Sequence, residues 1–151
     1  MKHWLVKEEP THYSFADLTR DGGTEWSGVR NALAQRYLRM MRPGDTGFYY
    51  HSGEVRAIVG VFRVDRGPEP ETGDDVGRVQ VRLRPESLLP NPVTLAAIKA
   101  DAAFRQFELV RISRLSVMPV PSPLWSRILS MSRRTRSTDQ PTSRKTRRSR
   151  A

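Results

Sequence analysis

The chain contains 151 residues, among them 26 lysines and arginines, 16 aspartates and glutamates and no cysteine, for a formal net charge of +10. Its length favours a single domain. The lack of cysteine excludes a disulfide framework and a thiolate zinc site, so stability has to come from a packed core. No apolar run approaches the roughly 20 residues that cross a bilayer, and the N-terminus lacks the features of a signal peptide. We therefore expect a cytoplasmic protein that does not bind membranes.

The strands and helices of the N-terminal third are marked by clear start and stop signals. Residues 3–7 predict a first strand that ends before Pro10. Ser14 and Asp17 have the spacing of a capping box at the start of a short helix. Residues 26–31 have the composition of a loop whose last residue, an asparagine, is a suitable N-cap for a helix over residues 32–41.

The middle of the chain predicts a hairpin. Residues 46–51 and 56–64 are rich in aromatic and β-branched side chains, and the Ser-Gly-Glu sequence between them is typical of a hairpin loop. Alternation along the first of these strands places Tyr49 and Tyr50 on opposite faces. One of the two tyrosines should therefore face the core and the other a surface or a cleft.

Three further segments follow with different patterns. Residues 65–76 are dense in glycine, proline and acidic residues and predict a mobile loop. Residues 78–84 alternate strictly, which predicts a strand with one buried face and a basic outer face. Residues 85–92 contain three prolines, which argues against regular structure.

The remainder of the chain predicts short helices around one more strand. Thr94 begins a short helical stretch, and a second covers residues 102–107. Residues 109–120 alternate imperfectly and predict the last strand, after which Ser122 and Pro123 begin a final helix. The total is about five or six strands without regular βαβ alternation, which indicates an α+β domain built on a small, strongly curved sheet or barrel.

The net charge is concentrated at the C-terminus. Residues 132–151 contain eight basic and one acidic side chain, a net of +7, and the preceding 131 residues contain 18 basic and 15 acidic side chains, a net of +3. The segment has no aromatic or branched aliphatic side chain to bury. We therefore expect a folded domain over residues 1–131 and a basic, disordered tail over residues 132–151.

The motifs of the common enzyme classes are missing. No glycine-rich dinucleotide or phosphate loop is present, and the three histidines do not have metal-ligand spacing. The best enzyme candidate is Lys7, Glu8 and Glu9 at the end of the first strand, where a glutamate beside a lysine could transfer a proton. A surface ion pair explains the same residues.

Five segments resemble, in order, the signature of the EVE domain family: residues 4–10 (WLVKEEP), 26–31 (WSGVRN), 48–52 (FYYHS), 58–61 (IVGV) and 114–120 (RLSVMPV). The resemblance covers about residues 2–131. It implies a PUA-like fold, which is a mixed β-barrel with short peripheral helices. It also implies a reader of modified bases in nucleic acid, with modified cytosine in DNA as the leading candidate, and no cofactor.

By position, the resemblance places the base-binding pocket on eleven residues: Lys7, Glu9, Trp26, Val29, Arg30, Asn31, Tyr50, His51, Leu115, Ser116 and Val117. Two neighbouring positions depart from the family pattern. Glu8 stands where the family usually has serine and adds negative charge near the expected mouth. Ala32 replaces a tyrosine that commonly follows the arginine-asparagine pair.

In the expected mechanism a flipped base enters a pocket walled by Trp26 and Tyr50, and Asn31 and Ser116 read its edge. Lys7 contacts a phosphate in this scheme. Arg30 either contacts a phosphate, stacks on the base or forms a structural tie to Glu9 or Glu25.

The basic tail would add salt-sensitive phosphate binding that does not depend on sequence, through Arg133, Arg134, Arg136, Arg144, Lys145, Arg147 and Arg148. An incidental extension is the alternative. Two other functions stay open for the domain: an enzyme acting on nucleic acid with Glu9 or Glu8 and Lys7 in acid–base roles, and a protein-interaction module with an occluded pocket. We expect a monomer without metal that binds DNA or RNA, with a nuclease or helicase as a candidate partner.

Overall fold

The structure is a computed structural model that describes residues 1–73 and 77–138. Its six strands form one sheet in the order β2-β5-β4-β3-β1-β6, in which only the β1–β3 pair is parallel. The strands are β1 (His3–Glu8), β2 (Thr24–Trp26), β3 (Thr46–His51), β4 (Ala57–Pro70), β5 (Val79–Thr94) and β6 (Val117–Pro119). The helices are α1 (Phe15–Asp21), α2 (Ala32–Met40), α3 (Leu95–Lys99), η1 (Ala102–Phe104), which is a 3₁₀ helix, α4 (Glu108–Arg111) and α5 (Ser122–Thr138).

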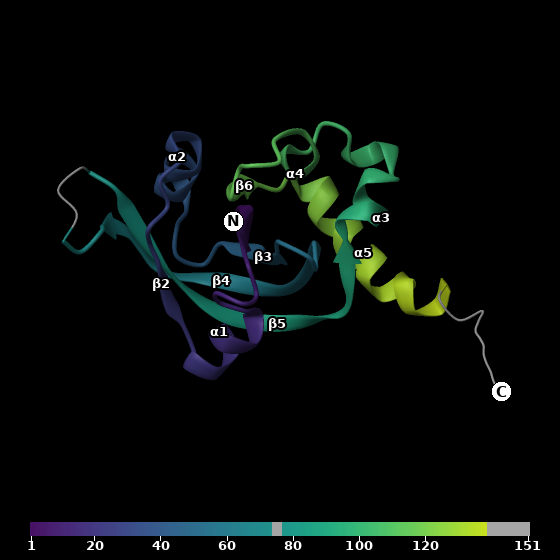
Figure 1. The fold of residues 1–151 in the computed structure, drawn as a ribbon, viewed down its shortest axis with the longest axis horizontal. Helices are drawn as coiled ribbons and strands as arrows, with labels where there is room; N and C mark the ends of the chain where they lie inside the picture. Colours follow the sequence, from purple (N-terminus) through teal and green to yellow (C-terminus); the bar gives the residue numbers. More distant parts are fainter. Residues whose placement is uncertain (74–76, 139–151) are drawn as a thin grey trace.

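The sheet curls because its two longest strands are bent. The β4–β5 ladder changes register at four places, and each such irregularity bends a strand and increases its twist. The result is an open half-barrel with helices around it (Figure 1). This confirms the α+β architecture with a strongly curved sheet and short helices that the sequence predicts.

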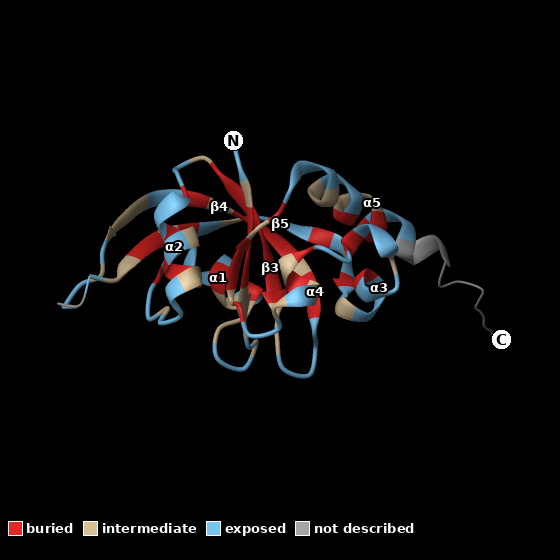
Figure 2. Cartoon of the chain, turned by 90° about the horizontal axis from the view of Figure 1, so that it is seen from above, coloured by how far each residue is buried: buried red, intermediate tan, exposed pale blue. Residues whose placement is uncertain are grey.

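The two faces of the sheet are covered by different helices. Helices α1 and α2 lie on one side of the strands, and α3 and α5 lie on the other (Figure 2). On the α5 side the Trp125 ring stacks between His3, at a centroid distance of 4.1 Å, and Phe48, at 4.0 Å. This stacking fixes α5 against β1 and β3.

Several local predictions are confirmed. Ser14 and Asp17 form a reciprocal capping box at the start of α1. The side chain of Asn31 caps α2 through the Ala34 amide, and Thr94 caps α3 in the same way. The predicted hairpin is formed by β3 and β4.

The prolines of residues 85–92 do not interrupt the sheet, which corrects the prediction for that segment. Strand β5 continues through them to Thr94; it pairs with β4 up to Leu88 and again at Val93 and Thr94, on either side of a register shift that contains Pro90 and Pro92. Strand β2 pairs with β5 only between Val81 and Leu83, so Pro85 lies where β5 has one neighbouring strand, and Pro90 and Pro92 lie at the register shift of the β4–β5 ladder. Proline is tolerated there because no second ladder needs its N–H group. Residues 65–70, predicted as part of a loop, also belong to β4.

The prediction of one strand over residues 109–120 is wrong as well. Residues 108–111 form α4, and only Val117–Pro119 pair with β1 as β6. A short apolar run does not by itself distinguish a helical turn from a strand. Within this segment only residues 117–119 pair with β1, and only they form a strand.

Helix α5 extends beyond the expected domain boundary, to Thr138. Ser132 is fully buried, and its hydroxyl donates to the Asn91 carbonyl at 2.6 Å and accepts from the Asn91 amide at 3.1 Å. The backbone of residues 132–138 is thus part of α5, contrary to the prediction of disorder from residue 132. Extending a helix that is already packed is easier than starting one, so a segment with no apolar side chains of its own can continue it.

Candidate functional site

The parallel pairing of β1 and β3 brings their carboxyl ends together at one edge of the sheet. Lys7 lies opposite Tyr50 and Glu8 opposite His51. The Ser52 amide donates to the Glu8 carbonyl at 2.9 Å, and the Lys7 amide donates to the Ser116 carbonyl at 2.9 Å. Three of the segments quoted above, around residues 7, 50 and 116, therefore meet at this edge.

A cavity of about 270 Å³ opens at this edge, on the side of α3 and α4. This volume is slightly below the roughly 300–1,000 Å³ of most small-molecule pockets. Lys7 and Tyr50 form one wall, Ser52 and Arg56 of the β3–β4 turn form the next, and apolar side chains and Lys99 close it from the helices. The apolar lining consists of Leu95, Leu109 and Val110.

Lys7 enters this cavity as a cation without a carboxylate partner. Its Nζ donates to the Ser113 carbonyl at 2.7 Å and lies 5.7 Å from the centre of the Tyr50 ring, within the range of a cation–π contact. Within the described residues Lys7 forms no ion pair. Burial lowers the pKa of its ammonium group below the usual range. The ammonium therefore has donors left for an acceptor-rich ligand.

Tyr50 contributes a buried hydroxyl group without a hydrogen bond. Tyr50 is 3% exposed, and its hydroxyl contacts no hydrogen-bonding partner among residues 1–73 and 77–138. Burial raises the pKa of this phenol. The other three tyrosines are satisfied: Tyr13 by Asp21, Tyr37 by Glu108 and Tyr49 by the Tyr13 carbonyl. Since buried polar groups almost always have partners, a ligand in the cavity is a natural partner for Tyr50.

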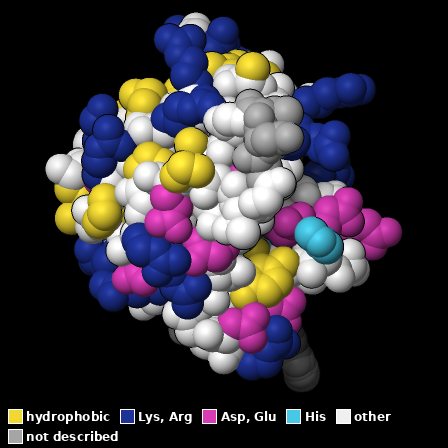
Figure 3. Space-filling view, turned by 90° about the vertical axis from the view of Figure 1, so that its left-hand side faces the viewer, with side chains coloured by type: hydrophobic (Ala, Val, Ile, Leu, Met, Phe, Trp, Pro, Cys, Tyr) yellow, Lys and Arg dark blue, Asp and Glu magenta, His cyan; other side chains and the backbone are white. Residues whose placement is uncertain are grey.

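The cavity differs in charge from the outer surface of the half-barrel. Its lining contains three cations, Lys7, Arg56 and Lys99, and no carboxylate. On the face toward the β4–β5 hairpin, basic and acidic side chains are interspersed (Figure 3). There the predicted basic face of β5 is compensated, because Arg66 and Arg82 pair with Glu25, Arg84 with Asp65 and Arg63 with Glu86.

Trp26 lies on the opposite side of β3 and does not line this cavity. It is 7% exposed and packs edge-to-face on Tyr49 at a centroid distance of 5.6 Å. The structure thus does not bring Trp26 and Tyr50 together as two walls of one pocket. Alternation places Tyr49 and Tyr50 on opposite faces as predicted: Tyr49 packs in the core against Trp26, and Tyr50, although buried, lines the cavity.

The other residues of the Trp26 segment are placed by helix α2. The Asn31 side-chain oxygen is occupied by the helix cap, at 2.9 Å from the Ala34 amide, and the Val29 carbonyl accepts from Gln35 at 2.9 Å. Arg30 is exposed. It forms neither of the expected ties, since Glu25 binds Arg66 and Arg82.

The acidic residues of the first segment do not form an acid–base pair with Lys7. Glu8 binds the His12 Nδ1 atom at 3.0 Å and the Glu9 amide at 3.0 Å. Glu9 is exposed and lies beside Gly53. No ion pair links either glutamate to Lys7 in the described part of the chain.

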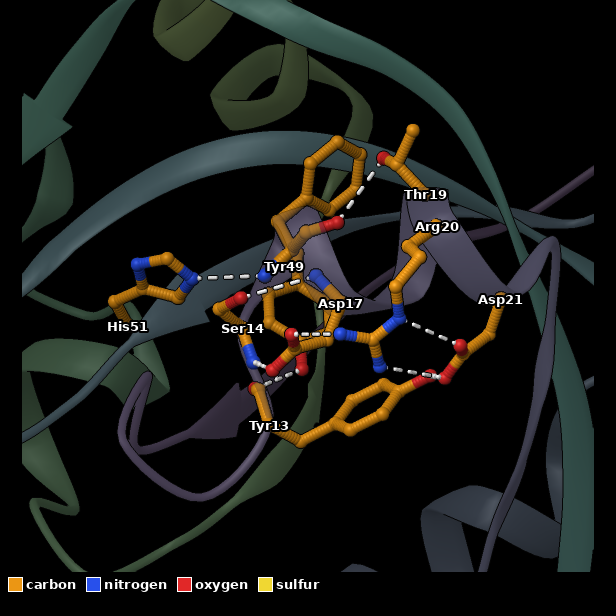
Figure 4. Close-up of polar contacts among 9 residues, drawn as sticks. Tyr13, Ser14, Asp17, Thr19, Arg20, Asp21, Tyr49 and His51 are labelled. Carbon is orange, nitrogen blue, oxygen red and sulfur yellow. Dashed lines mark hydrogen bonds and ion pairs between the residues drawn. The ribbon is translucent and has the colours of Figure 1, made fainter.

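His51 has a structural role next to the cavity. Its Nε2 atom accepts a hydrogen bond from the Phe15 amide at 3.1 Å (Figure 4), so the neutral ring carries its proton on Nδ1. Burial lowers the pKa of this ring. The contact attaches β3 to the start of α1, where Ser14 and Asp17 form the capping box.

The remaining expected residues divide between core and cavity edge. Leu115 and Val117 are buried, and Ser116 acts through its carbonyl on Lys7. Arg56, Lys99 and Ser113 line the cavity without having been expected. None of them belongs to the five segments quoted above, although Ser113 directly precedes the last one, and nothing in their local sequence marks them.

The basic tail is described only in part. Arg133 and Arg134 are exposed on α5, where Arg134 donates to the Ser130 hydroxyl at 2.8 Å. The side chain of Arg136 and the residues Arg144, Lys145, Arg147 and Arg148 lie outside the described structure. In the described ranges, no helix has the length and apolar character to cross a membrane, and no three metal-ligating side chains gather at one place.

Comparison with known proteins places the fold. A protein of Rhodopseudomonas palustris solved by NMR is 39% identical, with a TM-score of 0.84 over 87% of this chain and 93% of its own. A crystal structure of human thymocyte nuclear protein 1 in complex with DNA containing 5-methylcytosine aligns with a TM-score of 0.79 at 23% identity, over 87% of this chain and 98% of its own. These structures share the PUA-like half-barrel.

Curated relatives give a consistent assignment. Thymocyte nuclear protein 1 of Gallus gallus is 35% identical over 81 residues, which cover 46% of this chain and 34% of that protein. The human protein is 33% identical over 81 residues, which cover 46% of this chain and 36% of that protein. The alignments thus span about a third of the length of these relatives. The model of the EVE domain matches residues 2–131, and the chain therefore belongs to the EVE domain family.

Proposed function

We propose that this protein binds nucleic acid that carries a modified base, without catalysis, and that the base enters the cavity lined by Lys7 and Tyr50. One observation carries the proposal: the cavity has a cationic lining without carboxylates that includes Tyr50, a buried tyrosine whose hydroxyl has no hydrogen-bonding partner among the described residues. Such a lining favours a ligand that is rich in hydrogen-bond acceptors and attached to phosphate. A nucleotide meets both conditions.

The family supports the same class of ligand. Human thymocyte nuclear protein 1 has been crystallised with DNA that contains 5-methylcytosine. This chain is 33% identical to the human protein over 81 residues. For this chain, both the base modification and the choice between DNA and RNA are part of the proposal.

The chemistry of the cavity suits a modified pyrimidine. Taking a base out of a stack costs a few kcal/mol, which contacts in the pocket must offset. Lys7, Tyr50 and Ser52 can donate to the oxygen and ring nitrogen of a pyrimidine edge. The apolar lining from α3 and α4 can contact a methyl group, a contact worth about 1–3 kcal/mol in a fitted apolar pocket.

A titration of labelled oligonucleotides tests the proposal. Single-stranded and duplex DNA and RNA, each with one cytosine, 5-methylcytosine or 5-hydroxymethylcytosine, are titrated with the full chain and binding is followed by fluorescence anisotropy. We expect a preference for a modified base of roughly tenfold or more. Lys7→Gln should weaken binding, whereas the control Arg105→Gln, at an exposed site outside the cavity lining, should not.

Equal binding of all oligonucleotides, unchanged by Lys7→Gln, would refute this function. Trp26→Ala is not a suitable probe because Trp26 belongs to the core and its loss affects folding. Incubation of a modified oligonucleotide followed by mass spectrometry tests the enzymatic alternative, since a covalent change that Glu9→Gln abolishes would contradict a pure binding role.

The basic tail enters this proposal as an accessory arm. Its charges would add phosphate contacts that depend on salt and not on the base. A partner nuclease or helicase remains a prediction.

A further inference from the structure

Arg56 has an unusual backbone conformation at the edge of the cavity. Its φ of 49° makes it the only non-glycine residue with positive φ in the described structure. Residues other than glycine, asparagine and aspartate seldom adopt this conformation, and where they do the site is often functional. Arg56 ends the β3–β4 turn, and its carbonyl accepts from the Leu95 amide at 2.9 Å, which joins the turn to α3.

Arg56 also separates two neighbouring cavities. Beyond the cavity with Lys7 and Tyr50 lies a second one of about 350 Å³, and both are lined by Arg56, Leu95 and Lys99. The lining of the second cavity includes one carboxylate, Glu54. The two cavities thus adjoin at the β3–β4 turn and α3, and the cations Arg56 and Lys99 line both of them.

The charged side chains of Arg56 and Lys99 form no ion pair within the described residues, and both residues are exposed. The described arginines of β4 and β5, in contrast, mostly pair with acidic side chains. A guanidinium group and an ammonium group without partners at the border of a pocket are suited to a phosphate group.

We infer that Arg56 and Lys99 hold the phosphate that flanks the bound base, and that the strand leaves through the second cavity. The inference rests on the proposed function, because it assumes that the base occupies the first cavity. It assigns different contacts to the two pairs of residues: Lys7 and Tyr50 contact the base, whereas Arg56 and Lys99 contact the phosphate backbone of the nucleic acid.

The strained backbone makes Arg56→Gly a decisive variant. Glycine adopts positive φ without steric conflict, so this change removes the side chain and relieves the backbone while the carbonyl bond to Leu95 can remain. If the Arg56 side chain served to stabilise the fold, the protein would lose thermal stability on this substitution. We expect the melting temperature of Arg56→Gly to equal or exceed that of the wild type, and its affinity for the preferred oligonucleotide to fall roughly threefold to tenfold.

Two further measurements identify the phosphate. The slope of log affinity against log salt should become shallower by about 0.7–0.9 in Arg56→Gly and in Lys99→Gln, which is the value of one phosphate contact. Oligonucleotides with a single neutral methylphosphonate on the 5′ or the 3′ side of the modified base are then compared. Neutralising one of these two positions should weaken wild-type binding and have little further effect on Arg56→Gly.

The outcomes separate this inference from the proposed function. If the wild type shows no preference among bases and Lys7→Gln has no effect, the proposed function fails. If the preference exists but Arg56→Gly and Lys99→Gln bind with wild-type affinity and salt slope, only the phosphate assignment fails. Loss of the base preference itself in Arg56→Gly would also overturn the assignment, because a backbone contact should weaken all oligonucleotides alike.

Discussion

The adjacent residues Tyr49 and Tyr50 should respond in opposite directions to the same substitution. Both rings are buried, at 0% and 3% exposed, and phenylalanine keeps the ring in each case. The Tyr49 hydroxyl donates to the Tyr13 carbonyl at 2.6 Å, whereas the Tyr50 hydroxyl has no hydrogen-bonding partner among the described residues. The two variants therefore differ mainly in whether a hydrogen bond is lost.

The magnitudes follow from this difference. A buried polar group without a partner costs about 1–3 kcal/mol, so Tyr50→Phe should raise the free energy of unfolding by up to that amount. Tyr49→Phe should lower the free energy of unfolding by about 1–3 kcal/mol, because it removes the bond and leaves the Tyr13 carbonyl unsatisfied.

Denaturant unfolding and thermal melting of the two variants and the wild type provide the assay. For a chain of this size, each kcal/mol corresponds to roughly 2–4 °C in melting temperature. In the oligonucleotide titration Tyr50→Phe should bind about twofold to tenfold more weakly, since one hydrogen bond to the ligand is lost. A more stable protein that binds less well is thus the expected phenotype.

The reasoning is wrong if Tyr50→Phe destabilises the protein as much as Tyr49→Phe does. That result would mean that the Tyr50 hydroxyl supports the fold. Unchanged affinity of Tyr50→Phe for its preferred oligonucleotide would instead show that the ligand does not use this hydroxyl.

Two further predictions concern the fold around the site. Burial lowers the pKa of His51 below its unfolded value of about 6.5, so the unfolded state binds the proton more readily and stability should fall as the pH drops from 7.5 to 5.5. Urea unfolding of His51→Gln should show a smaller fall, although the lowered pKa of His3 retains part of it; an identical pH dependence would contradict the assignment. A chain ending at residue 131 should be about 1–3 kcal/mol less stable than one ending at residue 138, because it lacks Ser132 and its bonds to Asn91. The chain ending at residue 131 should keep any base preference and show a flatter salt dependence of binding than the full chain. Equal stability of the two truncated chains would show that Ser132 adds nothing to the fold.

Local signals in the sequence predicted elements whose ends are determined within a few residues. The capping box at Ser14, the cap at Asn31 and the turn after His51 each depend on side chains next to the element that they end. Such contacts form within one turn of helix or one hairpin, so composition and spacing are sufficient to identify them.

The extent of β5 and the nature of residues 108–117 depended on neighbours far away in sequence. Proline in β5 is compatible with the strand because no second strand pairs at Pro85 and because Pro90 and Pro92 lie at a register shift, and both facts depend on the sheet as a whole. The buried position of Ser132 likewise depends on Asn91, 41 residues earlier. Periodicity and composition do not contain this information.

For the function, the sequence by itself determined the family and the fold class, because five ordered segments carry the resemblance and each lies within a few consecutive residues. It also identified Lys7 and Tyr50, which do line the cavity. Only the tertiary structure decided that Trp26 packs against Tyr49 on the other side of the strand. It alone placed Arg56 and Lys99 beside Lys7. The physical reason is that the cavity forms where the parallel ends of β1 and β3 meet α3 and α4, and that meeting depends on how the whole sheet curls.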